Sequence, residues 1–188
     1  MEPKAKYGEA FILSAPYYAT LHTGYATEPP TRSSTMNNIT TFLLDDHRHC
    51  DDLFAAVEQA VTATDWARAA TAFASLHSAM EQHFSAEESI LFPAFEAKTG
   101  MTRGPTEVMR VEHGQMRELL GAALQSLQDK DADDYAGNAE TLLIMMQQHN
   151  MKEEHVLYPM CDEHLAEQCG ALLQSIGSQL SQAVGHRA

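Results

Sequence analysis

The sequence predicts an all-α chain, built as an up-down-up-down four-helix bundle with an irregular N-terminal segment and an extra C-terminal helix. Long stretches carry apolar residues at helical spacing. No stretch alternates as a strand does, and none shows the turn residues of a β-hairpin. A segment around His83 also returns 66 positions later around His149, as expected when two pairs of helices are built alike.

Start and stop signals divide the chain into five expected helices. Their expected bounds are, in order, about Thr35 to Ala63, Thr64 or Asp65 to Pro93, Pro105 to Asp129, Asp133 or Asp134 to Tyr158, and Glu163 to Val184. Ser34 or Thr35 is the expected N-cap of the first helix. Pro105 suits the first position of a helix, whereas Pro93 and Pro159 are expected to end helices.

The same signals predict three segments. They are an irregular N-terminal segment over 1–34, a four-helix bundle over 35–162, and a C-terminal helix over 163–188 that packs on the bundle. A chain of 188 residues is long enough for one domain that buries a core without disulfides.

Charge and cysteine content limit the partners and the compartment. The formal net charge of −14 repels phosphate backbones and anionic lipid, which argues against nucleic-acid and membrane partners. Three cysteines without a C-x-x-C pair favour a reducing compartment. No signal peptide is predicted, and no stretch approaches the roughly 20 apolar residues of a membrane helix. A cytoplasmic location is therefore expected.

The repeat retains residue types that bind metals. Met80–Pro93 aligns with Met146–Pro159, and seven of the fourteen positions are identical, including one His, two consecutive Glu and the Pro. The same offset pairs Asp46-His47 with Glu112-His113. Helix composition alone explains a short repeat less readily when the His, Glu and Pro stay in register.

Mirrored spacing predicts that these residues meet. His47 and His83 are equally distant from the expected turn at position 65, and His113 and His149 from the turn at position 131. Equal distances from a turn give equal heights in a bundle, and a carboxylate four residues after a histidine shares its face. The side chains predicted to converge are His47, His83, Glu87, His113, His149 and Glu153.

Such a set of buried polar groups indicates a metal site. Imidazoles and carboxylates are costly to bury unless they are paired, and metal ions remove that cost. Two facing carboxylates can bridge two cations, which leaves about two histidines for each. Nitrogen and oxygen ligands without thiolate suit iron, manganese or zinc alike. The sequence lacks Glu-x-x-His and His-Glu-x-x-His, so ferritin-like and zinc-protease sites do not fit.

Over about residues 42–162 the sequence resembles the hemerythrin-like, or HHE cation-binding, family. The motifs that carry this resemblance are Asp46-His47, His83-x-x-x-Glu87-Glu88 followed by Leu-Phe-Pro, Glu112-His113, and His149-x-x-x-Glu153-Glu154 followed by Leu-Tyr-Pro. The resemblance implies a four-helix bundle around two non-haem iron ions, with the four histidines as ligands and Glu87 and Glu153 as bridges. Family members bind dioxygen reversibly, sense oxygen or iron, or act in nitric-oxide and iron–sulfur repair chemistry.

The chain departs from the family's oxygen carriers, which use a fifth histidine, commonly four positions from another on the third helix. No histidine lies four positions from His113, and the sequence leaves open whether His77 or His22 ligates. A four-histidine site leaves more coordination positions for dioxygen or nitric oxide. The family's repair proteins often carry an N-terminal cysteine-rich segment, and residues 1–46 contain no cysteine.

The residues beside the expected ligands allow several readings. Asp46 and Glu112 either orient a ligand imidazole through its second ring nitrogen or are exposed. Glu88 and Glu154 are turned by about 100° from the ligand face. Surface or helix-end roles are therefore at least as plausible for them as hydrogen bonds that support a metal ligand. Tyr158 is expected simply to pack in the core.

Three hypotheses for the function follow. The leading one is a non-enzymatic di-iron protein that binds a small diatomic ligand, dioxygen or nitric oxide, or senses oxygen or iron. The second is a di-iron oxidoreductase that acts on nitric oxide or peroxide, or an iron donor for iron–sulfur cluster repair. The third is a metal-free helical interaction module. The sequence predicts no oligomeric state.

Overall fold

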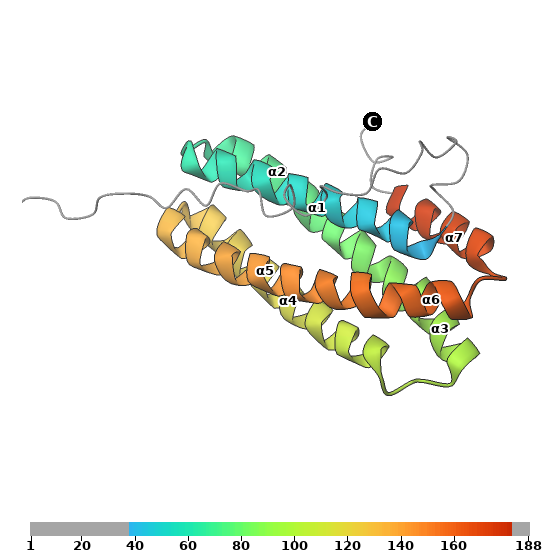
Figure 1. Ribbon diagram of the computed structural model, residues 1–188. Coiled ribbons are helices and arrows are strands. Elements are labelled where there is room, and N and C mark those ends of the chain that lie inside the picture. The colour runs from blue at the N-terminus through green and yellow to red at the C-terminus, as the bar shows by residue number, and fades with distance from the viewer. Residues whose placement is uncertain (1–37, 182–188) are drawn as a thin grey trace, which may run out of the picture. The chain divides into compact units, whose positions relative to one another are not determined.

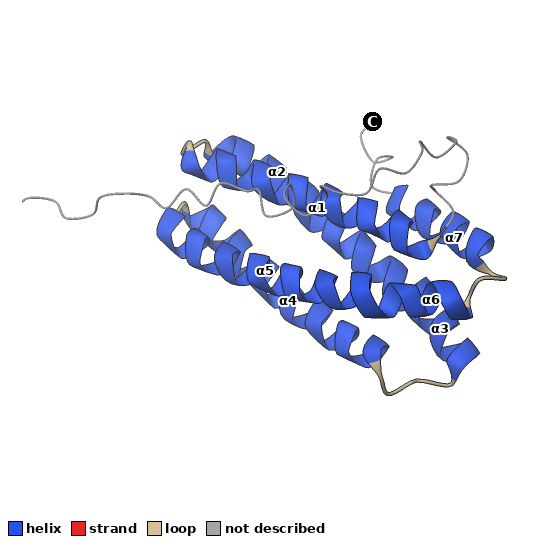
Figure 2. Ribbon diagram, viewed as in Figure 1, coloured by secondary structure: helices blue, strands red, loops and turns tan. Residues whose placement is uncertain are grey.

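The computed structural model describes residues 38–181, and nearly all of this part is helical (Figures 1 and 2). The elements are α1 (Ile39–Thr62), α2 (Trp66–Ala86), the π-helical turn η1 (Glu87–Leu91), α3 (Phe92–Thr99), α4 (Pro105–Asp129), α5 (Ala132–Lys152), the π-helical turn η2 (Glu153–Leu157), α6 (Tyr158–His164) and α7 (Cys169–Ser181). No strand occurs among the described residues, which confirms the all-α prediction for them. The segment expected over 1–34 lies outside the described residues.

Side-chain caps determine where the long helices begin. The Asn38 side chain accepts an N–H of the first turn at 2.7 Å, so α1 begins at Ile39 and the predicted start near Thr35 is too early. Asp65 caps α2 in the same way, as the sequence predicts. Asp131 caps α5, which therefore begins just before its predicted start. Each such cap satisfies a free backbone N–H and contributes about 1 kcal/mol.

The prolines act in two ways. Pro105 occupies the first turn of α4, as predicted. Pro93 and Pro159 do not end helices; they lie in the first turns of α3 and α6, which follow η1 and η2 without a break. A π-helical turn has i→i+5 hydrogen bonds and a wider backbone. The turn after it can therefore hold a proline ring that an ordinary helix interior would reject.

The long helices pack in two pairs. The first helix pair is α1 with α2, and the second helix pair is α4 with α5 (Figure 1). Buried positions of α1 recur every three or four residues, as Leu43, His47, Cys50, Phe54 and Val57 illustrate. That spacing gives each helix an apolar stripe that faces its neighbours.

Two apolar clusters lie one after the other along these helices. The first includes Phe54, Phe73 and Met80, and the second includes Leu43 together with residues of α3, α6 and α7. On α1, Leu43 of the second cluster and Cys50 of the first flank His47, which is 4% exposed. The level of the bundle at which the buried His47 lies is called the polar level. Apolar clusters enclose it on both sides along the helices.

The C-terminal part differs from its prediction. A turn over 165–168 separates α6 from α7, so the helix predicted to begin at Glu163 begins instead at Cys169. Leu172 and Ile176 of α7 are buried in the second cluster. Among the described helices, none has the length and apolar character needed to cross a bilayer.

Candidate metal centre

Six buried side chains from the two helix pairs turn inward at the polar level. They are His47 of α1, His83 of α2, Glu87 of η1, His113 of α4, His149 of α5 and Glu153 of η2. Each is at most 4% exposed. The structure thus brings together all the residues that mirrored spacing singles out.

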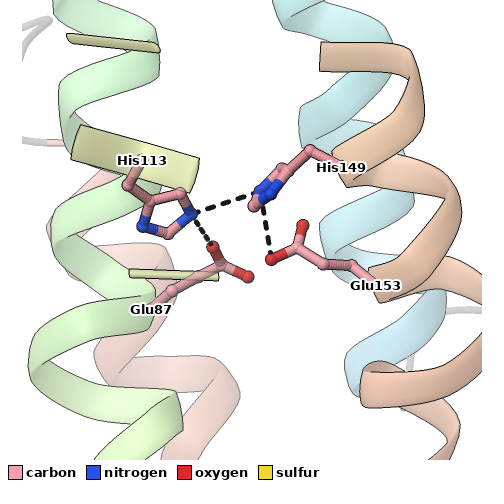
Figure 3. Close-up of side chains that lie close together, drawn as sticks. All are labelled: Glu87, His113, His149 and Glu153. Carbon is pink, nitrogen blue, oxygen red and sulfur yellow. Dashed lines mark hydrogen bonds and ion pairs between the residues drawn. The ribbon is translucent and has the colours of Figure 1, made fainter. Parts of the chain in front are cut away.

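Four of these side chains point at one another (Figure 3). The Nε2 atom of His113 lies 3.2 Å from Nε2 of His149 and 3.2 Å from Oε2 of Glu87. The Nε2 atom of His149 lies 3.2 Å from Oε1 of Glu153. Ligand atoms that sit about 2.0–2.2 Å from one ion are roughly 3–4 Å apart, so this spacing suits atoms around a shared cation.

A second group lies beside the first. The Nε2 atom of His47 is 3.2 Å from Nε2 of His83 and 3.3 Å from Oε2 of Glu153. The Nε2 atom of His83 is 3.4 Å from Oε2 of Glu87. Glu153 therefore directs one oxygen at each group, and Oε2 of Glu87 lies near His83 as well as near a histidine of the first group. Both carboxylates stand in positions from which they can bridge two ions.

The other ring nitrogen of each histidine contacts a carboxylate. These contacts are His47 Nδ1 to Glu154 at 2.8 Å, His83 Nδ1 to Asp46 at 2.8 Å, His113 Nδ1 to Glu88 at 2.8 Å and His149 Nδ1 to Glu112 at 3.0 Å. An ionised carboxylate only accepts hydrogen bonds, so each Nδ1–H is the donor. Of the alternatives that the sequence leaves open for these acidic residues, the structure favours the orienting role for all of them.

This tautomer makes the centre fit a cation. In the neutral form of each ring, with the proton on Nδ1, Nε2 presents a lone pair, and two lone pairs 3.2 Å apart repel unless a proton or a metal cation lies between them. Oε2 of Glu87 and Oε1 of Glu153 are fully buried and accept no hydrogen bond. Buried carboxylate oxygens without donors are costly, and a metal ion is the group that satisfies them together with imidazole lone pairs.

The outer carboxylates differ in charge between the two groups. Arg117 donates to Glu88 at 2.8 Å and 3.2 Å, and Lys152 forms a short ion pair with Glu112. The position that matches Arg117 in the repeat holds Asp51, an acidic residue whose pKa is raised by burial. The surroundings of His113 and His149 thus carry more positive charge than those of the other two histidines.

Charges within the centre move pKa values in opposite directions. Burial alone would lower the pKa of His47, but contacts with carboxylates, chiefly Glu153, outweigh it and raise the pKa from 6.5 to about 10. Burial and the charge of His149 lower the pKa of His113 to about 4. Burial and the charge of Glu153 raise the pKa of Glu87 to about 7. Protons therefore compete with cations for these atoms.

Tyr158 is the residue that the sequence argument misses. Its hydroxyl lies 2.8 Å from Oε1 of Glu87, 2.9 Å from Oε2 of Glu153 and 3.1 Å from Nε2 of His47. The side chain is fully buried and packs in the second cluster, as the sequence predicts, yet it also reaches the polar centre. A tyrosine near a repeated Glu-Glu motif does not by itself indicate that its hydroxyl contacts the centre.

Of the two histidines considered as a fifth ligand, the structure describes only His77, which does not join the centre. His77 packs near Phe73, with ring centroids 6.4 Å apart, and supplies no atom to either group. His22 lies outside the described residues. Next to His47 is a small cavity whose other walls include Cys50 and methionine side chains.

Comparisons with known proteins give one match. Residues 38–161 match the family model described as the hemerythrin HHE cation binding domain. This range covers both helix pairs and every residue of the centre. No curated protein matches the chain, and no solved structure does.

Proposed function

This chain belongs to the hemerythrin HHE cation-binding domain family, and from that membership we propose that it is a non-haem di-iron protein that binds or senses dioxygen, nitric oxide or iron. The observation that carries the proposal is that the four Nε2 atoms lie against two buried carboxylates, of which the atoms Glu87 Oε2 and Glu153 Oε1 accept no hydrogen bond. Each Nδ1–H is already held by an outer carboxylate, which fixes the imidazoles for metal binding.

The ligands divide between two ion positions. We assign His47 and His83 to one ion and His113 and His149 to the other, with Glu153 directing an oxygen at each. Glu87 serves as the second bridge. The donor chemistry suits iron and also accepts manganese or zinc, so the identity of the metal rests on family membership and on the experiment below.

The arrangement of the chain is part of the proposal. We infer that the two helix pairs form an up-down-up-down four-helix bundle within 35–162. The C-terminal helix within 163–188 packs on the bundle. Contacts of α1 with α2, of α4 with α5, and of α7 with α2 support this organisation.

The ligand of the centre is a small diatomic molecule. Two ferrous ions would supply open coordination positions and electrons for binding dioxygen or nitric oxide. The small cavity beside His47 has room for about one water-sized molecule, and Cys50, Met80 and Phe84 supply apolar parts of its wall. The net charge of −14 opposes nucleic-acid binding, so a macromolecular anion is not the proposed partner.

A di-iron oxidoreductase is the second candidate. The observation that favours it is the Tyr158 hydroxyl, a proton donor held against both inner carboxylates. A carrier or sensor has no use for repeated proton delivery, whereas reduction of nitric oxide or peroxide consumes protons. Rapid steady-state consumption of either compound by the iron-loaded chain would favour the enzyme over the binding protein.

Metal content tests the proposal directly. We expect about two irons per chain, measured by inductively coupled plasma mass spectrometry on untagged protein after anaerobic loading with ferrous iron. Glu140→Gln, a change on an exposed face of α5, serves as the matched control and should keep both ions. One zinc or manganese per chain would retain a metal site but refute the di-iron function. No bound metal would refute the site itself.

A further inference from the structure

One side of the centre carries an additional oxygen atom, that of Tyr158. The residue is the first of α6, directly after η2, and its side chain is fully buried. Its hydroxyl oxygen lies within 3.1 Å of atoms from Glu87, Glu153 and His47.

One phenol cannot satisfy these three neighbours. A hydroxyl donates a single hydrogen, and all three neighbouring atoms present lone pairs when His47 is the neutral ring that binds a metal, with its proton on Nδ1. If Tyr158 donates to Glu87, its oxygen still faces Oε2 of Glu153 at 2.9 Å as one lone pair against another. The phenol oxygen therefore adds a lone pair to those that the inner ligands direct at one another. A nearby cation would remove the repulsion among these lone pairs.

The group of ligand atoms beside Tyr158 contains fewer residues than the other group. The first group contains four residues whose ligand atoms all lie close together, whereas the second contains three, His47, His83 and Glu153. Glu87 approaches the second group through His83, at 3.4 Å. The phenol oxygen is close to two of those three, at 3.1 Å from His47 and 2.9 Å from Glu153. It stands where a further donor to the smaller group, beyond the two histidines and the bridging carboxylates, would stand.

The repeat leaves the other side without this atom. Phe92 occupies the matching position, after η1, and its ring stacks near the ring of His113 with centroids 5.9 Å apart. A phenylalanine fills the same volume but offers no oxygen. The backbone is equivalent at this position on the two sides, so the difference between Phe92 and Tyr158 is the hydroxyl alone.

We propose that the phenol oxygen of Tyr158 is a further protein ligand of the metal ion held by His47 and His83. The inference rests on the proposed di-iron function. On binding, the O–H bond breaks, its proton leaves to solvent, and the oxygen keeps the electron pair that it shares with the metal. Iron accepts such hard oxygen ligands readily. The two ions then differ, because only one has a phenolate.

Visible and resonance Raman spectroscopy test the ligand. The full chain is loaded anaerobically with ferrous iron, oxidised to the ferric state, and compared with Tyr158→Phe and Tyr135→Phe. A phenolate bound to ferric iron gives a visible charge-transfer band whose excitation enhances phenolate ring vibrations, whereas a hydrogen-bonded phenol gives neither. Tyr135 is the matched control because it is also a buried tyrosine, 2% exposed, beside a carboxylate outside the centre.

We expect the band and the ring vibrations in the wild type and in Tyr135→Phe, and their loss in Tyr158→Phe. Iron content and far-ultraviolet circular dichroism of each variant show whether it is loaded and folded. Two irons without phenolate vibrations in the wild type would overturn the Tyr158 ligand and leave the di-iron function standing; this reading does not depend on any variant. Absence of iron from the wild type would overturn both.

Discussion

Replacing Glu153 by glutamine should remove most of the stability that the metal confers. The change keeps the size of the side chain but removes the charge that faces His47 at 3.3 Å and His149 at 3.2 Å. Loss of an outer carboxylate alone weakens metal binding by about 10–100-fold, so loss of a ligand shared by both groups should cost at least about 100-fold.

The expected magnitude comes from linkage between binding and folding. At a free metal concentration of about 1,000 times Kd, binding stabilises the wild type by about 4.1 kcal/mol. A 100-fold weaker variant keeps only about 1.4 kcal/mol at the same concentration, a difference of about 2.7 kcal/mol. For a chain of this size, that difference corresponds to a change in Tm of roughly 5–11 °C.

The assay is thermal unfolding under anaerobic conditions, with and without ferrous iron, for wild type, Glu153→Gln and the exposed control Glu140→Gln. Comparing the gain in Tm on adding iron cancels any effect of the substitution on the metal-free protein. The control should gain as much as the wild type. If Glu153→Gln also gains as much, Glu153 does not hold the metal and the assignment of bridging carboxylates is wrong.

Three further predictions can be checked with the same protein. In Glu154→Ala, His47 Nδ1 loses its 2.8 Å acceptor, so metal affinity measured by competition with a chelator should fall about 10–100-fold. The exposed control Glu118→Ala should leave the affinity unchanged. Equal affinities of Glu154→Ala and the wild type would refute the orienting role. The raised pKa of His47, about 10, means that the metal-free protein is stabilised by the protonated ring below pH 6.5 and loses this stabilisation as the pH rises toward 10. Metal must displace that proton, so affinity should rise by about tenfold per pH unit from pH 7 to 9 with measurable proton release, and a flat profile would contradict the raised pKa. Phe73→Ala in the first cluster should lower the free energy of unfolding by about 3–5 kcal/mol in urea while the folded variant still binds two metals; loss of metal would show that packing far from the ligands sets the centre.

The sequence predicts which six side chains converge at the centre because helical geometry is regular where they lie. His47 and His83 are placed by counting from the turn at Asp65, and the structure retains that turn. The start of α1 is less predictable because several residues before Ile39 can cap a helix, and Asn38 does so. Competition among adjacent polar side chains is not visible in a periodic pattern.

Tyr158 escapes prediction for a different reason. In a regular α-helix a residue five positions after Glu153 is turned by about 140° from it, which places Tyr158 on another face. The π-helical turn η2 closes the backbone N–H of Tyr158 onto the carbonyl of Glu153 and returns both side chains to one side. A single π-helical turn leaves no mark in hydrophobic periodicity, so the sequence identifies Tyr158 only as core.

The centre also has a consequence for the order in which the chain folds. Each helix pair joins neighbours across a short turn, so its contacts are local and can form early. The centre instead joins residues far apart in the sequence, such as His47 and Glu154 at a separation of 107 residues. Closing so long a loop costs more chain entropy than closing a short turn, so this step is slower. We expect each helix pair to form first and the two pairs to dock in a late, rate-limiting step. Metal present during refolding would then act chiefly on that step, trapping the docked pairs and slowing their separation, while the formation of either pair proceeds at its own rate.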